Sequence, residues 1–114
     1  MHMLNRDSAT RRIRTLNDNF RTTFIGGKVF FSQIVAELPL DFKAQAILAV
    51  QNFTAFDADN DPHHEHDFGD FEIAGERYFF KIDYYNLDMS GGTEDPADPG
   101  VTTRVLTIMH VSEY

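Results

Sequence analysis

The spacing of hydrophobic residues changes from a helical period to a two-residue period along this chain. Ile13, Leu16, Phe20 and Phe24 follow one another at steps of three, four and four, which predicts one apolar face of a helix. Asp7 or Ser8 is a suitable N-cap for this helix, and Gly26-Gly27 is expected to end it. Beyond residue 65 the apolar residues alternate with polar ones, as in half-buried strands. Helices followed by strands predict an α+β fold.

The remaining elements follow from shorter signals. We expect a short strand at 28–31, a turn of helix over 32–38 that ends before Pro39, and a second main helix capped by Asp41 and running to about Phe53. Strands are predicted at 66–73, 77–85 and 102–111. Nothing divides the chain, so 1–114 is expected to be one domain, with an antiparallel three-strand meander packed on two N-terminal helices and an extra strand near 28–31.

The central strand of this meander has two different faces. Tyr78, Phe80, Ile82 and Tyr84 form one face, which we expect to contact the helices. Phe79 and Tyr85 would lie on the other face among charged residues. An uncovered sheet face with aromatic residues is a candidate contact surface, through which the chain could also form a homodimer.

Charge is distributed unevenly. The chain has 18 acidic and 10 basic residues and a formal net charge of −8. The first 21 residues are mildly basic, with five arginines, whereas thirteen of the acidic residues fall between Asp57 and Asp98, against only Arg77 and Lys81. We therefore expect an electrically dipolar molecule, with a basic helix and an acidic body. This balance excludes a protein that coats DNA or RNA, which needs a basic surface.

Two absences narrow the function further. The sequence has no cysteine, which excludes disulfides, thiolate metal sites and a thiol nucleophile and suits a reducing compartment. No apolar run reaches the roughly 18 residues of a membrane span. The expectation is a cytoplasmic protein that does not bind a membrane.

The acidic segments 57–70 and 88–98 are the candidate partner-binding surface. In an extended chain, alternate residues such as Asp57, Asp59 and Asp61 lie ~6.6–6.8 Å apart, about two axial phosphate steps along one DNA strand. Carboxylates at that spacing could imitate a nucleic-acid backbone. The alternative is a solvated surface that keeps a small protein soluble. The candidate contact residues are Asp57, Asp59, Asp61, Glu65, Asp67, Asp70, Asp88, Glu94, Asp95, Asp98, Phe79 and Tyr85.

The segment 63–67 is the densest group of possible metal ligands. His63, His64, His66 and Asp67 could bind zinc, which needs a third and usually a fourth ligand. His110, Asp83 or an acid of the 86–101 segment could complete such a site only through the fold. A metal- or small-ligand-binding module is therefore the alternative function, and a solvated histidine cluster is the competing interpretation.

A catalytic site is the third hypothesis. His66 with Asp67 or Asp83 could form an acid–base pair near a further group of polar residues, namely Lys81, Tyr84 and Arg104. Salt bridges within a sheet explain Lys81, Asp83 and Arg104 equally well. The sequence has no Gly-x-Ser-x-Gly elbow and no Walker lysine motif. We expect a protein that is not an enzyme and that needs no cofactor.

Several segments together resemble one family over nearly the whole chain. They are FRTTFIGG (20–27), NDP (60–62), EHDFG (65–69), KIDYY (81–85), DPADP (95–99) and TTRVLTIM (102–109), with Glu113 and Tyr114. The chain resembles the domain-of-unknown-function family 3768.

The resemblance implies a context but no activity. Members of this family are small bacterial proteins, often found on plasmids or other mobile elements, and no catalytic residues can be transferred from them. This context implies a counter-defence factor, such as an anti-CRISPR or anti-restriction inhibitor. The expected partner is a protein or nucleoprotein complex with a basic nucleic-acid channel, blocked by mimicry or sterically. The expectation includes no direct binding of nucleic acid.

Overall fold

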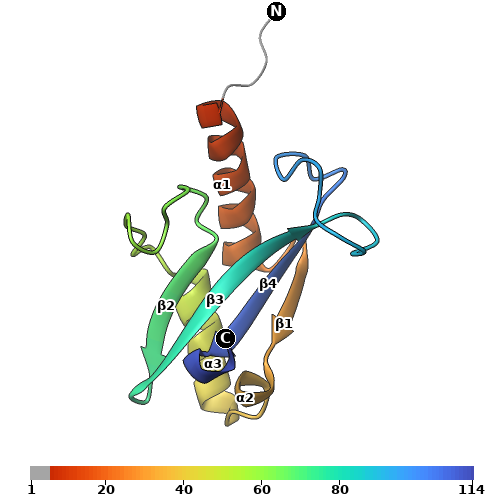
Figure 1. Cartoon of the computed structure of the whole chain (residues 1–114). Helices are drawn as coiled ribbons and strands as arrows, with labels where there is room; N and C mark the ends of the chain where they lie inside the picture. The colour runs from red at the N-terminus through yellow and green to blue at the C-terminus, as the bar shows by residue number, and fades with distance from the viewer. Residues whose placement is uncertain (1–5) are drawn as a thin grey trace, which may run out of the picture.

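The helical stripe forms the long helix α1 (Arg6–Thr23), whose C-terminal part packs at one end of a four-stranded sheet and whose N-terminal part extends beyond that end (Figure 1). The computed structural model describes residues 6–114. After α1 come β1 (Lys28–Phe31), α2 (Gln33–Ala36), α3 (Leu40–Gln51), β2 (Phe68–Ile73), β3 (Glu76–Tyr85), β4 (Thr103–His110) and the 3-10 helix η1 (Val111–Glu113). None of the helices in this described part has the length and apolarity needed to cross a membrane.

The ends of the helices differ from expectation at three points. Because α1 already includes Arg6, Asp7 and Ser8 lie within the helix, and neither is its N-cap. Phe24 itself, with φ 61°, takes the left-handed conformation after α1, and its N–H donates to the Phe20 carbonyl at 2.7 Å. Gly27 is needed for another reason, because a Cβ there would lie 2.5 Å from the Arg104 carbonyl oxygen. The prediction that Asp41 is the N-cap of α3 is wrong. Pro39 occupies that position, and Asp41 lies in the first turn, where a carboxylate favours the helix dipole.

The fold is α+β as predicted, but the sheet is mixed. β2, β3 and β4 are antiparallel neighbours, and β1 adds to the free side of β4 as a parallel strand, with Lys28 opposite Val105 and Phe31 opposite Ile108. The strand order is β1-β4-β3-β2. The predicted strand at 28–31 and the predicted antiparallel meander of three strands are both present, but the whole sheet has four strands, because β1 joins it as a parallel strand. The β1–β4 pairing joins residues 77 positions apart, such as Lys28 and Val105, so no local pattern specifies it.

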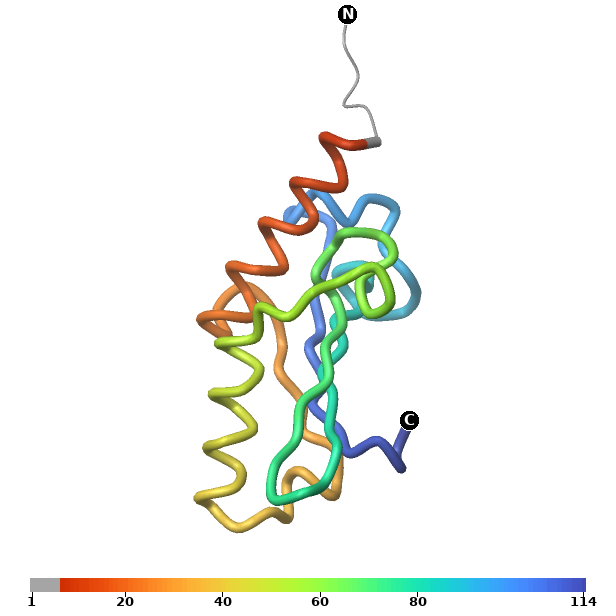
Figure 2. The backbone as a smooth tube through the Cα atoms, turned by 90° about the vertical axis from the view of Figure 1, so that its left-hand side faces the viewer, coloured from red at the N-terminus to blue at the C-terminus, as the bar shows by residue number. Residues whose placement is uncertain are grey.

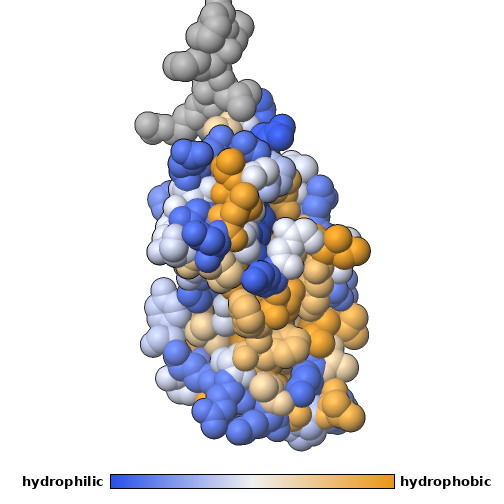
Figure 3. Space-filling model, turned by 90° about the vertical axis from the view of Figure 1, so that its right-hand side faces the viewer, coloured by the Kyte–Doolittle hydropathy of each residue, from blue (hydrophilic) through white to orange (hydrophobic). Residues whose placement is uncertain are grey.

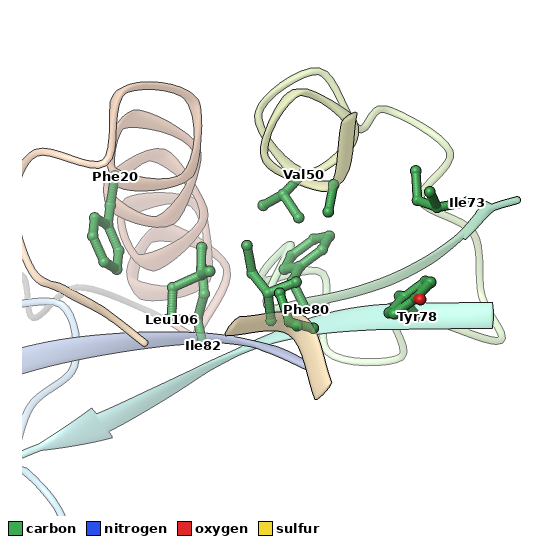
Figure 4. Packing of buried hydrophobic residues seen from close by; sticks show 10 residues of the cluster. Phe20, Val50, Ile73, Tyr78, Phe80, Ile82 and Leu106 are labelled. Carbon is green, nitrogen blue, oxygen red and sulfur yellow. The ribbon is translucent and has the colours of Figure 1, made fainter. Parts of the chain in front are cut away.

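The core lies between the helices and one face of the sheet. Phe20 of α1 and Val50 of α3 point toward Phe80, Ile82 and Leu106 of the sheet (Figure 4). All five side chains are at most 4% exposed. This confirms that the face of β3 carrying Phe80 and Ile82 contacts the helices. Burying a side chain of this size contributes about 1.5–3 kcal/mol to stability.

The opposite face of the sheet is partly covered, contrary to expectation. The chain end lies on the side of the sheet away from α1 and α3 (Figure 2). Phe79 is only 4% exposed, because the rings of Phe68 and Tyr114 lie 5.2 and 5.1 Å from its ring. Val105 on the same face is also buried. Phe79 is therefore not the exposed aromatic residue that the strand pattern predicted.

Candidate functional site

Two acidic loops lie at one end of the molecule, on either side of α1 (Figure 1). The first loop (52–67) joins α3 to β2, and the second loop (86–102) joins β3 to β4. Together they contain all of the predicted acidic contact residues except Asp70, which lies on β2. The fold therefore gathers two segments that are separate in sequence.

The first loop is a tight turn rather than an extended segment. Asp57 accepts hydrogen bonds at Oδ1 from the N–H groups of Asp59 and Asn60, both at 2.9 Å. Asp61 is 3% exposed, and its Oδ1 accepts from the N–H groups of Glu65 and His66, both at 3.0 Å. The regular carboxylate spacing expected for 57–61 is therefore wrong. Asp61 supports the loop and is not available to a partner.

The second loop uses its aspartates in the same way. Each of three aspartates accepts a hydrogen bond from the backbone N–H two residues further along the chain. Asp88 accepts from Ser90 at 3.1 Å, Asp95 from Ala97 at 3.0 Å and Asp98 from Gly100 at 2.8 Å. Hydrogen bonds from the Ser90 side chain and backbone lower the pKa of Asp88. All three aspartates nevertheless remain exposed. Each of them holds its own turn and keeps its charge in solvent.

Arginines of α1 bind the backbones of these loops. Arg12 Nε donates to the Ala97 carbonyl at 2.7 Å, and Arg14 donates to the His64 carbonyl at 3.1 Å. Arg104 of β4 donates to the Pro96 carbonyl. These bonds fix the position of both loops through main-chain oxygens.

The exposed carboxylates therefore stay unpaired. Within the part of the chain that the structure describes, the only acidic residues that form ion pairs are Asp18, Asp61, Asp70, Glu76 and Asp83. Among the side chains of residues 7–114, no basic group lies within 4.0 Å of the carboxylates of six exposed residues. These are Asp57, Asp59, Asp88, Glu94, Asp95 and Asp98.

A buried polar network lies beneath the loops. Asn17 is at its centre: its Oδ1 accepts a hydrogen bond from Arg104 Nε at 2.8 Å, and its Nδ2 donates to the Tyr84 hydroxyl at 2.7 Å. The Tyr84 hydroxyl in turn donates to Glu65 Oε1 at 2.7 Å. Burial, followed by the Glu65 hydrogen bond, raises the pKa of Tyr84. Burial and the nearby charge of Glu65 raise the pKa of Asp67. Glu65 and Asp67 thus belong to the interior side of the loop more than to its surface.

The structure separates the predicted metal ligands. His66 lies with Nδ1 2.8 Å from Asp18 Oδ1, and its ring stacks on Phe56 with centroids 3.8 Å apart. His63 and His64 are exposed. Over residues 6–114, no three His, Asp or Glu side chains are grouped so that they could hold a metal ion.

The predicted catalytic residues are also apart. Lys81 Nζ lies 2.7 Å from Asp83 Oδ2, and both residues alternate with the buried Phe80 and Ile82, so they lie on the face away from the helices. Tyr84 and Arg104 belong to the network under α1, and His66 contacts Asp18 and Asp61 instead of Asp67 or Asp83.

A groove of about 650 Å³ runs from the first loop over the outer face of β2 and β3 to the chain end. Its lining has an apolar part, which we call the floor, and a polar part, which we call the rim. The floor comprises Phe68, Phe79, Val111 and Tyr114, and the rim comprises Asn60 and the charged residues Asp57, Asp59, Asp70 and Arg77. We call this groove the acidic groove. Arg77 and Asp70 form an ion pair at 3.0 Å within this rim.

The acidic groove brings together four of the predicted contact residues, Asp57, Asp59, Asp70 and Phe79. Sequence reasoning missed Phe68 and Tyr114. Phe68 could have been predicted from the sequence, because it lies two residues before Asp70 and therefore on the same face of the strand. Tyr114 could not, because its place depends on Glu113, which accepts hydrogen bonds from Ser32 and from the Ile34 N–H of α2.

A smaller hollow of about 480 Å³ lies in the second loop. Asp88 and Glu94 line it together with Leu87, which is 64% exposed. Tyr85 is half-buried and pairs with Gly92 of the same hollow. Predicted contact residues therefore surround hollows in both loops.

Comparison with known proteins gives one match. Residues 31–113 match the family described as "Protein of unknown function (DUF3768)", a region that contains both loops and all of the residues that line the acidic groove except Tyr114. No curated protein and no solved structure matches the chain. Because the match covers most of its length, this chain belongs to the DUF3768 family.

Proposed function

We propose that this protein is a non-enzymatic interaction protein that binds a cationic protein surface with its two acidic loops and its acidic groove. The partner's surface is of the kind that otherwise holds the backbone of DNA or RNA. Binding there would exclude the nucleic acid, so the protein would inhibit a nucleic-acid-handling complex, such as one that serves host defence.

The observation that carries the proposal is the set of six exposed carboxylates without a paired cation. Their loops are held in place by side-chain caps and by the bonds from Arg12, Arg14 and Arg104 to the main chain. Loops that are already ordered lose little conformational entropy on binding. Grouped charge of one sign speeds the encounter with an opposite surface.

The acidic groove supplies the short-range contacts. The aromatic rings of Phe68 and Tyr114 line the acidic groove together with the carboxylates of Asp57, Asp59 and Asp70. A lysine or arginine side chain can place its alkyl stem or guanidinium plane on such rings while its charge meets the rim. This arrangement needs no regular spacing of carboxylates, so it does not depend on an extended 57–61 segment.

The test compares two variants of equal net charge in binding a fluorescent oligoarginine peptide. The loop variant carries Asp57→Asn, Asp88→Asn, Asp95→Asn and Asp98→Asn; asparagine keeps the Oδ1 acceptor of each cap. The control variant carries Asp7→Asn, Glu37→Gln, Asp41→Asn and Glu72→Gln, four exposed acids outside the loops. Circular dichroism confirms that both variants are folded.

Stopped-flow association at low salt should be about tenfold slower or more for the loop variant and near wild type for the control. High salt should remove the difference. Equal slowing of both variants would show that only net charge matters and would contradict the proposal.

A further inference from the structure

β1 is an open edge of the sheet with an apolar surface. It pairs only with β4 among the strands of the described chain. Phe30 and Phe31 are 48% and 37% exposed, and Ile25 and Ile34 beside the strand are also exposed. Hydrophobic side chains gather on this side of the molecule (Figure 3). Natural edge strands are usually protected by charges, prolines or bulges, and β1 has only Lys28.

The backbone of β1 defines what could cover this edge. The Ser32 N–H donates to the Ile108 carbonyl, and in a parallel ladder alternate residues bond to the neighbouring strand. The backbone N–H and C=O groups that face β4 are therefore those of Lys28, Phe30 and Ser32. The N–H and C=O groups of Val29 and Phe31 face the opposite way, toward the unpaired edge of the sheet. No described residue hydrogen-bonds to those outward groups. An extended strand is the structure that satisfies them.

We infer that β1 pairs with β1 of a second copy of this chain, antiparallel, about a twofold axis at Phe30. In this register Val29 of one copy lies opposite Phe31 of the other, and each such pair exchanges two main-chain hydrogen bonds. Phe30 lies opposite Phe30 of the other copy as a non-hydrogen-bonded pair, in which side chains approach most closely. Lys28 lies opposite Ser32, so no like charges face each other.

The charge distribution favours a second copy in this orientation. Each chain carries a net charge of −8, with the excess in the two acidic loops at one end. Antiparallel pairing of β1 points the loops of the two copies to opposite ends of the dimer, so their charges stay apart. The strand is uncharged except at Lys28, so it matches an equally apolar strand better than an acidic or basic segment.

The interface is small. Four-residue strands bury less surface than the roughly 1,200–2,000 Å² of a standard stable interface. We therefore expect a weak dimer in rapid exchange, whose sedimentation coefficient rises with protein concentration.

The test uses opposite charges at the twofold axis. Sedimentation velocity is measured over a concentration series for the wild type and for Phe30→Glu and Phe30→Lys. Like charges at this position face each other across the axis, so each variant alone should stay monomeric. An equimolar mixture of the glutamate and lysine variants should dimerise again, because opposite charges then face each other. Leu48→Glu and Leu48→Lys, at a residue 56% exposed on α3, are the matched controls and should dimerise like the wild type.

The outcomes are distinct. Loss of the dimer in both single variants together with its return in the mixture supports the inference. A wild-type chain that remains monomeric up to its solubility limit overturns it. A dimer that persists in both Phe30 variants, with circular dichroism showing folded protein, also overturns it, because the copies would then meet through another surface.

Discussion

Asp57 and Asp61 stand four residues apart in one acidic run, but the fold uses them differently. Asp57 holds the turn with Oδ1 and stays exposed, while Asp61 is buried against the N–H groups of Glu65 and His66. Residue type and spacing cannot separate these roles, because each depends on which backbone N–H groups the loop presents. A neutralising substitution must therefore preserve the cap if it is to report on charge alone.

Asp67→Asn should raise the melting temperature at neutral pH by a few degrees. Burial and the neighbouring carboxylates raise the pKa of Asp67 above its usual range, so the ionised form costs stability in the folded state. That cost is complete only above the raised pKa. It should shrink as the pH falls through this pKa and vanish below the pKa of the unfolded chain.

Thermal melts from neutral to acidic pH check this prediction, with the exposed Asp59→Asn as control. The gain of Asp67→Asn over the control should decrease steadily toward acidic pH. A gain that is independent of pH, or a loss at neutral pH, would show that the ionised carboxylate at 67 is not destabilising.

At the scale of the elements, α1 positions both loops. Arg12 and Arg14, two residues apart on α1, bond to the backbones of the second and first loop. Arg11, next to them, donates a hydrogen bond to Ser8 of the same helix and to no other residue of the described part of the chain. Arg12 and Arg14 therefore fix the acidic loops without forming ion pairs with the carboxylates of the described residues.

Arg12→Ala should speed amide hydrogen exchange around residues 94–98, and Arg14→Ala should do so around 62–66. A hydrogen bond worth about 1 kcal/mol corresponds to roughly a fivefold loss of protection where exchange requires the loop to open. Arg11→Ala is the matched control and should leave both loops unchanged. Faster exchange over the whole chain, or none in either loop, would contradict a local role for these arginines.

The elements show how far sequence could predict this structure. α1 and β3 follow from periods of 3.6 and two residues, and Phe80 and Ile82 face the helices as that period requires. The parallel pairing of β1 with β4 and the cover over Phe79 depend on contacts between distant segments. The sequence predicts the loop acids as candidate contact residues, but only the fold separates the exposed Asp59 from the buried Asp61.

At the scale of the whole molecule, the basic helix lies between the acidic loops rather than apart from them. The charge separation expected from sequence is therefore reduced along α1. The acidic groove lies toward β2, whereas the apolar strand β1 forms the other edge of the sheet. A dimer through β1 would leave both grooves free, so the two proposed surfaces can be tested independently.

The most direct test of the central claim is an NMR titration of the ¹⁵N-labelled protein with the oligoarginine peptide at low salt. If the unpaired carboxylates act together, shift changes should concentrate in residues 57–61 and 88–98 and at the floor of the acidic groove, and added salt should reverse them. Shift changes spread equally over exposed acids elsewhere, such as Glu37, Asp41 and Glu72, would contradict the account.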